Sequence, residues 1–238
     1  MVGFIASLSQ AGQLPLQHKV DVDWLLSDAL AASLRDRIDL ERALPPAPAL
    51  TPAEHQDTVY ITVVDRDRNC VNFINSLFHP FGSGLMAPDS GVLLHNRGQS
   101  FVVEPEHPNA IGPHKRPMHT IIPGMVTQGG RVRMNFGVMG GHYQALGHAH
   151  FLSKVLHYGL DTQSAMDLPR IFPRPGTDGV EVEATMPASV CAALTERGFR
   201  LSPSPSAIGG SQAIWIDWDH GVLVGASDHR KDGCALGY

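Results

Sequence analysis

An abrupt change in sequence character between residues 57 and 58 constrains this chain more than any other feature. Residues 44–57, LPPAPALTPAEHQD, contain four prolines, which interrupt a helix because proline has no backbone N–H to donate. The following residues, TVYITVVD, are almost all β-branched, aromatic or aliphatic, which is typical of a strand. We therefore expect an exposed linker, open to cleavage, that ends at Asp57, and a strand that begins at Thr58.

The remaining patterns alternate strand pairs with helices. Hairpins are predicted from 58–78, 119–138 and 211–228, the last turning at His220-Gly221, and a short strand is predicted over 91–96. Helices are predicted within 21–43, 139–159, 162–170 and 187–198. Because strand pairs follow one another without regular βαβ repeats, the predicted fold class is α+β with antiparallel sheets.

Composition and charge exclude several classes of partner. The formal net charge is −5, which gives no reason to expect nucleic acid or an anionic membrane surface as a partner. No apolar run reaches the roughly 18 residues that a transmembrane helix needs. The first residues, MVGFIASLSQAGQLPLQ, lack the basic region of a secretory signal, so a cytoplasmic location is expected.

Thr58 stands at the joint between linker and strand, and the residues alone leave two roles open for it. In the first role it is only the opening residue of a strand. In the second it is a nucleophile, because cleavage before Thr58 frees an α-amine beside the hydroxyl, where the amine serves as the base. The reference pKa of an α-amino group is about 8, so much of it accepts a proton near neutral pH.

The Gly140-Gly141 pair, in FGVMGGHYQ, also leaves two alternatives open. It lies between a predicted strand and a predicted helix, where it forms either a tight turn or an anion-binding site. Glycines let backbone N–H groups approach a ligand closely, and a helix N-terminus favours negative charge. Those two properties suit an oxyanion hole, which binds the negative oxygen of a tetrahedral intermediate.

The histidines of the 139–159 helix do not predict a metal site. Helical residues that face one ion lie three or four positions apart, whereas His148 and His150 are two apart. No metal and no other cofactor is therefore expected.

Several segments together resemble a known family. In chain order these are residues 57–98, then GPHKRPMHTIIPGMV, FGVMGGH, DLPR, GGSQAIW and finally GASDHR with the closing GY. They resemble the small subunit of the γ-glutamyltransferases (γ-glutamyltranspeptidases) and their acylase-like relatives. The resemblance covers residues 58–238 as a small-subunit-like catalytic domain. Residues 1–57 are assigned to the tail of a large-subunit-like region and the proline-rich linker.

The resemblance implies a fold and a set of site residues. The fold is the four-layer α-β-β-α sandwich of N-terminal-nucleophile hydrolases, with only part of the large-subunit half present in this chain. A precursor of this family cuts itself before a threonine that becomes the nucleophile, and Thr58 is the matching position. The other matching positions are Ser76 as a support for the nucleophile, Gly140 and Gly141 at the oxyanion hole, and His119 and Thr120 beside the substrate carboxylate.

Three departures from the family pattern concern the substrate. Phe78 replaces an asparagine, Arg97 replaces a glutamine, and Ser100 replaces an aspartate that pairs with the ammonium of a γ-glutamyl group. Arg97 offers a guanidinium fork suited to a carboxylate. A dicarboxylic acyl group without an amine, such as glutaryl, therefore becomes an alternative to γ-glutamyl.

These inferences predict an autocatalytically cleaved amidohydrolase or acyltransferase of the kind that acts in glutathione metabolism. The first alternative is a glutaryl-type acylase, and the second is a truncated, non-catalytic remnant that needs a partner chain. Only 57 residues precede Thr58, which is short for a large subunit. A separate large-subunit-like chain or self-association is therefore expected, because half a sandwich would leave apolar sheet faces and edges exposed.

Overall fold

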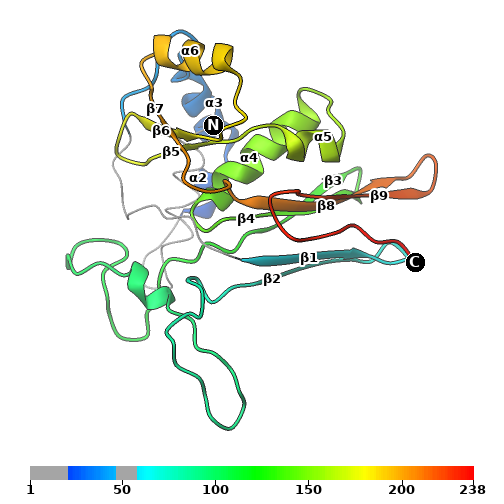
Figure 1. Cartoon of the computed structure of the whole chain (residues 1–238), viewed down its shortest axis with the longest axis horizontal. Helices are drawn as coiled ribbons and strands as arrows, with labels where there is room; N and C mark the ends of the chain where they lie inside the picture. Colours follow the sequence, from blue (N-terminus) through cyan, green and yellow to red (C-terminus); the bar gives the residue numbers. More distant parts are fainter. Residues whose placement is uncertain (1–20, 47–57) are drawn as a thin grey trace. The chain divides into compact units, whose positions relative to one another are not determined.

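The computed structural model describes residues 21–46 and 58–238 (Figure 1). These residues form two compact units. The first unit contains 96–120 and 169–206 with the described N-terminal residues, and the second contains 58–95, 121–168 and 207–238. Most of the predicted linker and Asp57 lie outside the described residues, so the boundary between residues 57 and 58 stays a prediction. No helix of the described chain is long and apolar enough to cross a bilayer.

The second unit contains the three predicted hairpins. A two-stranded antiparallel sheet pairs β1 with β2, and a four-stranded sheet has the order β3-β4-β8-β9. The hairpin predictions are confirmed, because each strand pairs with its neighbour in sequence and β4 also pairs with β8. The strands are β1 (Val59–Val64), β2 (Cys70–Asn75), β3 (Pro123–Gln128), β4 (Arg131–Met139), β8 (Gly210–Asp217) and β9 (Val222–Ser227).

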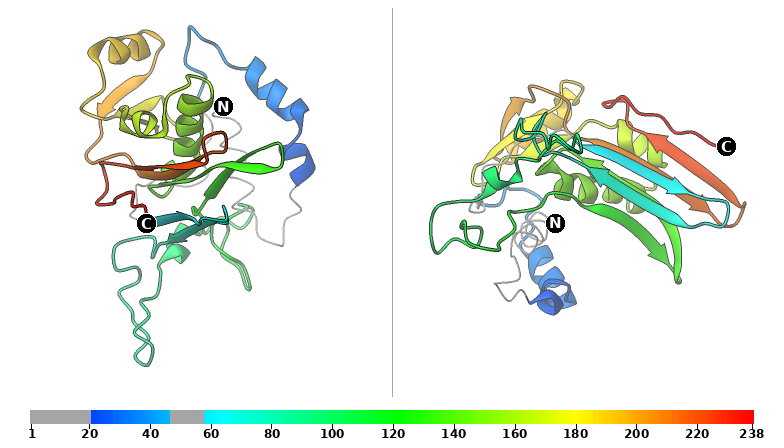
Figure 2. Two further views of the ribbon diagram at one scale, coloured as in Figure 1. Left: turned by 90° about the vertical axis from the view of Figure 1, so that its right-hand side faces the viewer. Right: turned by 90° about the horizontal axis from the view of Figure 1, so that it is seen from below.

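Three layers build this unit. Strands β1 and β2 pack on one face of the four-stranded sheet, mainly against β4 and β8, as Figure 2 shows with β1 and β2 in cyan. Helices α4 (Tyr143–Leu156) and α5 (Thr162–Asp167) pack on its other face. The core under the helices is apolar and includes Met134, Phe136, Phe151, Met166 and Ala213. This is the helix-sheet-sheet portion of a sandwich, so the α+β prediction is confirmed.

The first unit holds a small sheet that the sequence patterns did not reveal. Its strands β5 (Ile171–Pro173), β6 (Gly179–Val182) and β7 (Arg200–Pro203) are only three or four residues long. Strands β6 and β7 are parallel and are joined through α6 (Ala188–Glu196). The expectation of antiparallel sheets alone is therefore wrong here, because strands this short carry no readable alternation of apolar residues.

Two further predictions need correction. The predicted helix within 21–43 is two helices, α2 (Val22–Leu25) and α3 (Asp28–Asp36), because Ser27 takes an extended conformation and its hydroxyl accepts a hydrogen bond from Leu30 N at 3.1 Å. Ser27 is thus the N-cap of α3, and it separates α3 from α2. The predicted strand over 91–96 is reduced to a single bridge between Met86 and Leu93.

A histidine joins α4 to the sheet beneath it. The Nε2 atom of His148 accepts a hydrogen bond from the backbone N–H of Val138 on β4 at 3.1 Å, and its ring lies 5.0 Å from that of Phe136. Burial lowers the pKa of His148 to about 4. The imidazole is therefore neutral in the folded protein at neutral pH, with Nε2 as acceptor.

This depressed pKa predicts a loss of stability in acid. The unfolded chain binds a proton at His148 near pH 6.5, whereas the folded chain resists protonation until about pH 4. The free energy of unfolding should therefore fall as the pH drops from 6.5 to 4, by up to about 3 kcal/mol from this group. Urea unfolding at pH 7 and pH 5 measures this fall. The control is His148→Gln, whose side chain can accept the same hydrogen bond but does not titrate. Equal pH dependence in both proteins would contradict the prediction.

Candidate active site

The hydroxyl of Thr58 meets the hydroxyl of Ser76 within the second unit. Thr58 directly precedes β1 and Ser76 directly follows β2, so the antiparallel pairing of the two strands brings these residues together. Thr58 Oγ1 donates to Ser76 Oγ at 3.4 Å, which is a long hydrogen bond, and both residues are half-buried. Ser76 Oγ also accepts from the backbone N–H of Phe78 at 3.0 Å. The Ser76 hydroxyl therefore links the Thr58 hydroxyl to the Phe78 backbone.

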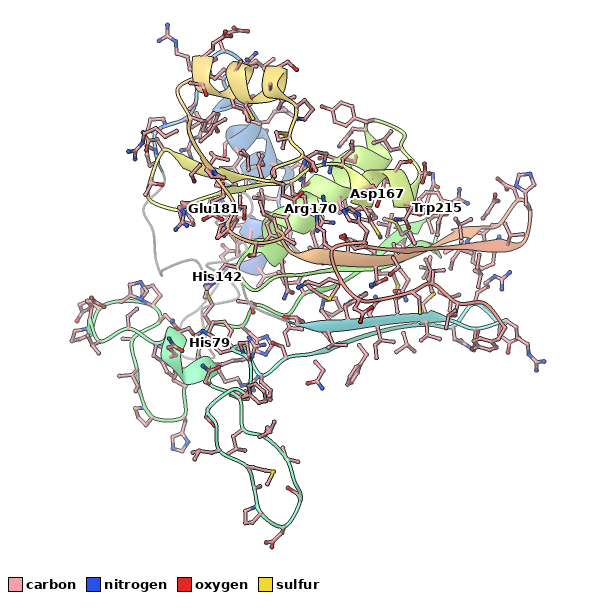
Figure 3. All side chains as sticks on the ribbon, in the orientation of Figure 1. His79, His142, Asp167, Arg170, Glu181 and Trp215 are labelled. Carbon is pink, nitrogen blue, oxygen red and sulfur yellow. The ribbon has the colours of Figure 1, made fainter. Side chains whose placement is uncertain are left out.

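Phe78 is buried beside this pair in an unusual backbone conformation. Its φ angle is +79°, in the left-handed region that non-glycine residues rarely occupy, and only 5% of its surface is exposed. The ring stacks on His79 at 5.1 Å between centroids and meets His142 edge-on at 6.4 Å. Figure 3 labels both histidines. The sequence did not predict that these two histidines contact Phe78. The available signal for His142 was its position directly after the glycine pair.

The glycine pair forms the turn between β4 and α4. Gly140 has a φ of +123° and Gly141 a φ of +57°, so both occupy conformations that favour glycine. The carbonyls of Gly140 and Gly141 accept the N–H groups of Tyr143 and Gln144, which begins the helix. Helix α4 is 14 residues long and starts without a side-chain cap. Its N-terminus therefore suits an anion, as an oxyanion hole requires.

A third glycine, which sequence reasoning did not single out, packs against this turn. A Cβ on Gly140 would lie 2.9 Å from the Cα of Gly209, just before β8. Gly209 has a φ of +64°, and its own Cβ would lie 2.5 Å from the carbonyl oxygen of Met139. The backbone turn is thus enclosed by another backbone segment at van der Waals distance. The GGSQ motif was the available signal, because paired glycines often mark a close backbone approach.

The first unit contains four of the five residues predicted for substrate binding and brings three of them, Arg97, Ser100 and Thr120, into contact. Arg97 is 4% exposed and donates from its guanidinium to Thr120 Oγ1 at 3.1 Å, and Thr120 is also buried. Burial lowers the pKa of Arg97. Ser100 ends the same short 3₁₀ helix, η1 (Arg97–Ser100), and its hydroxyl donates to the Arg97 carbonyl at 2.7 Å. His119 is exposed, so it does not share the buried position of Thr120.

Metal ligands do not gather in the described part of the chain. Residues 21–46 and 58–238 contain no group of three His, Cys, Asp or Glu side chains placed to hold an ion.

Comparison with known proteins adds a family and several relatives. A family model described as gamma-glutamyltranspeptidase matches residues 9–238. The glutathione hydrolase-like YwrD proenzyme of Bacillus subtilis is 35% identical over 188 residues, which are 76% of this chain and 36% of that protein. The oxamate amidohydrolase proenzyme of Klebsiella pneumoniae is 34% identical over 232 residues, 94% of this chain and 43% of that protein. The chain thus spans less than half the length of these curated relatives.

Two solved structures are similar in fold. The cephalosporin acylase from Bacillus halodurans superposes with a TM-score of 0.85 at 37% identity, over 97% of this chain and 43% of that one. The gamma-glutamyltranspeptidase from Pseudomonas nitroreducens complexed with L-DON gives a TM-score of 0.69 at 26% identity, over 78% of this chain and 100% of the matched chain.

The close approach of Gly140 to Gly209 predicts the effect of adding one methyl group. Gly140→Ala should lower the free energy of unfolding by about 1–3 kcal/mol, because the Cβ meets backbone and the φ is unfavourable. Gly129→Ala is the matched control, since Gly129 also has a positive φ of +58° but open space around its Cβ. Chemical denaturation of both variants measures the difference. Equal losses would show that the Gly140–Gly209 contact contributes nothing.

Proposed function

Because the chain belongs to the gamma-glutamyltranspeptidase family, we propose that it is the nucleophile-bearing part of an amidohydrolase or acyltransferase that matures by cutting itself before Thr58. The observation that carries this proposal is the meeting of the Thr58 and Ser76 hydroxyls at the start of β1. The relatives' description as proenzymes supports the maturation step. Thr58 is the proposed nucleophile, and Ser76 holds its hydroxyl.

Maturation and catalysis use the same atom. In maturation, Thr58 Oγ attacks the carbonyl carbon of Asp57, the C–N bond breaks, and the resulting ester is hydrolysed by water to leave a free α-amine on Thr58. In catalysis, that amine accepts the hydroxyl proton while Oγ attacks the carbonyl carbon of an amide substrate. The proton passes to the leaving amine, an acyl-threonine ester forms, and water or a second amine releases the acyl group.

The proposed oxyanion donors are the backbone N–H groups of the Gly140-Gly141 turn. The negative oxygen of the tetrahedral intermediate would lie at the uncapped N-terminus of α4, where preorganised N–H dipoles stabilise it. Loss of one such donor costs roughly a hundredfold or more in turnover. The tight packing of Gly140 against Gly209 supports this role, because the donors would not need to reorganise as charge develops.

The proposed acyl group is a dicarboxylic one without an amine, such as glutaryl, and γ-glutamyl is the alternative. This assignment comes from the resemblance, which gives Arg97, Ser100, His119, Thr120 and Phe78 as substrate-binding positions. The buried Arg97 guanidinium, oriented by Thr120, supports binding of a carboxylate. Ser100 carries no charge, so it cannot neutralise the ammonium of a γ-glutamyl group.

A large-subunit-like chain is the proposed partner, and the second unit supports it. Strands β1 and β2 have one apolar face that points away from the four-stranded sheet. Five residues of that face are 39–60% exposed, namely Val59, Ile61, Val63, Val71 and Phe73. Within the described residues, each of these strands pairs only with the other, so each has an open edge. An exposed apolar face beside open strand edges is typical of a surface that another layer covers.

Cleavage before Thr58 is directly measurable. The purified wild-type protein, co-expressed with its large-subunit-like partner, should yield a fragment that begins at Thr58, as detected by intact mass and N-terminal sequencing. Thr58→Ala should stay uncut because it lacks the attacking oxygen, and Thr58→Ser should cut because it keeps one. An uncut wild-type protein in that complex would favour the non-catalytic remnant.

The substrate proposal predicts a preference between two matched anilides. The matured enzyme should hydrolyse glutaryl anilide with a kcat/KM about tenfold or more above that of γ-glutamyl anilide, because the buried Arg97 repels the extra ammonium. Ser100→Asp should narrow the gap by giving the ammonium a partner. Ser90→Asp, which adds the same charge at an exposed position of another loop, is the control. A preference of the wild-type enzyme for γ-glutamyl anilide would return the chain to the transferase alternative.

A further inference from the structure

A buried network of polar side chains crosses between the two sheets of the second unit. Asn135 on β4 is fully buried, and its Nδ2 donates to Thr62 Oγ1 at 2.7 Å and to the Val71 carbonyl at 3.0 Å. Asn72 on β2 donates to Asn135 Oδ1 and to the Gly124 carbonyl, the latter at 2.8 Å. Tyr60 on β1 completes the network by donating its hydroxyl to Asn72 Oδ1.

An aromatic contact accompanies these hydrogen bonds. The ring of Tyr60 lies against Gly137 on β4 so closely that a Cβ on Gly137 would fall 2.2 Å from a ring carbon. Tyr60 is 5% exposed, and burial raises the pKa of its hydroxyl, so the hydroxyl stays a proton donor. Glycine at position 137 is therefore what allows β1 to lie this close to β4.

The network links the two strands that carry the separate parts of the candidate active site. Thr58 directly precedes β1, only two residues before Tyr60, and Gly140 directly follows β4, five residues after Asn135. Strand β1 pairs with β2 from Val59 onward, and β4 pairs with β8 as far as Met139, so regular pairing reaches the residues next to Thr58 and Gly140. A shift of β1 along or across β4 would move Thr58 relative to the glycine turn.

We infer that the Tyr60–Asn72–Asn135–Thr62 network positions the Thr58 nucleophile relative to the glycine turn, and that these four are positioning residues for the reaction. The inference rests on the proposed function of Thr58. An apolar interface would fill the same space but would allow neighbouring registers of similar energy. Directional hydrogen bonds favour one arrangement, because any shift leaves buried amide groups without partners. Misplacement by about 1 Å is enough to cost roughly a hundredfold in rate.

The test compares variants of the matured complex with glutaryl anilide as the probe. Asn135→Leu keeps the number and branching of the side-chain heavy atoms and removes every hydrogen bond of the central amide. Thr62→Val keeps the β-branched shape and removes one acceptor, so it gives a measurable variant even if Asn135→Leu fails to fold. We expect kcat to fall about 10- to 100-fold for Asn135→Leu and several-fold for Thr62→Val, with KM within about twofold. The rate of cleavage before Thr58 should fall in parallel.

A stability control separates positioning from general damage. Gln163→Ala removes two hydrogen bonds between α5 and the Ser227 backbone on β9, elements that carry no proposed catalytic residue. It should lower the unfolding midpoint yet leave kcat within about twofold. If Gln163→Ala lowers kcat as much as Asn135→Leu does, the effect is general and the positioning inference is wrong.

The outcomes distinguish this inference from the function on which it rests. A wild-type complex that neither cuts before Thr58 nor hydrolyses either anilide overturns the proposed function, and the positioning role with it. A wild-type complex that cuts and turns over, while folded Asn135→Leu and Thr62→Val keep the wild-type kcat and cleavage rate, overturns the positioning role alone.

Discussion

Strand β4 is held along both edges and on both faces, and this constraint fixes the packing of the second unit. This strand has β3 on one edge and β8 on the other, with β1 and β2 on one face and α4 on the opposite face. Residues Met134–Met139 are consequently all buried, and side chains on each face must match a different layer. Met134 and Phe136 contribute to the apolar core under the helices, whereas Asn135 and Gly137 face the smaller sheet. The strand therefore cannot slip by one residue without placing an amide in the apolar core.

This constraint also explains where the candidate chemistry lies. Gly140 and Gly141 follow the most buried strand directly, so the turn begins from a fixed point and its backbone N–H groups have a fixed direction. Thr58 and Ser76 instead lie at the open end of the β1–β2 hairpin, whose two strands form hydrogen-bonded ladders only with each other within the described residues. The buried Asn72 and Asn135 side chains tie this hairpin to the larger sheet, next to the proposed nucleophile.

The outer face of β1 and β2 exposes several apolar side chains to solvent. Ile61 pairs with Phe73 and Val63 with Val71, so the exposed side chains form adjacent apolar pairs across the two strands. Isolated exposed apolar residues are common on protein surfaces, but a contiguous face of this kind is typical of a buried layer. The chain also spans less than half the length of its curated relatives. The exposed apolar face supports the proposal that another layer covers these two strands.

The hairpins, the longer helices and the family could be predicted from the sequence, because each depends on local patterns or on motifs in a fixed order. The sequence also pointed to Thr58 and to the glycine pair as candidates. The folded chain adds that Gly209 encloses Gly140 and that one buried network joins Tyr60 to Asn135, and it gives the distance between the Thr58 and Ser76 hydroxyls. These contacts join residues far apart in sequence, and which side chains meet depends on how the sheets pack. Local patterns in a single sequence do not reveal how the sheets pack, so these contacts could not be predicted from it.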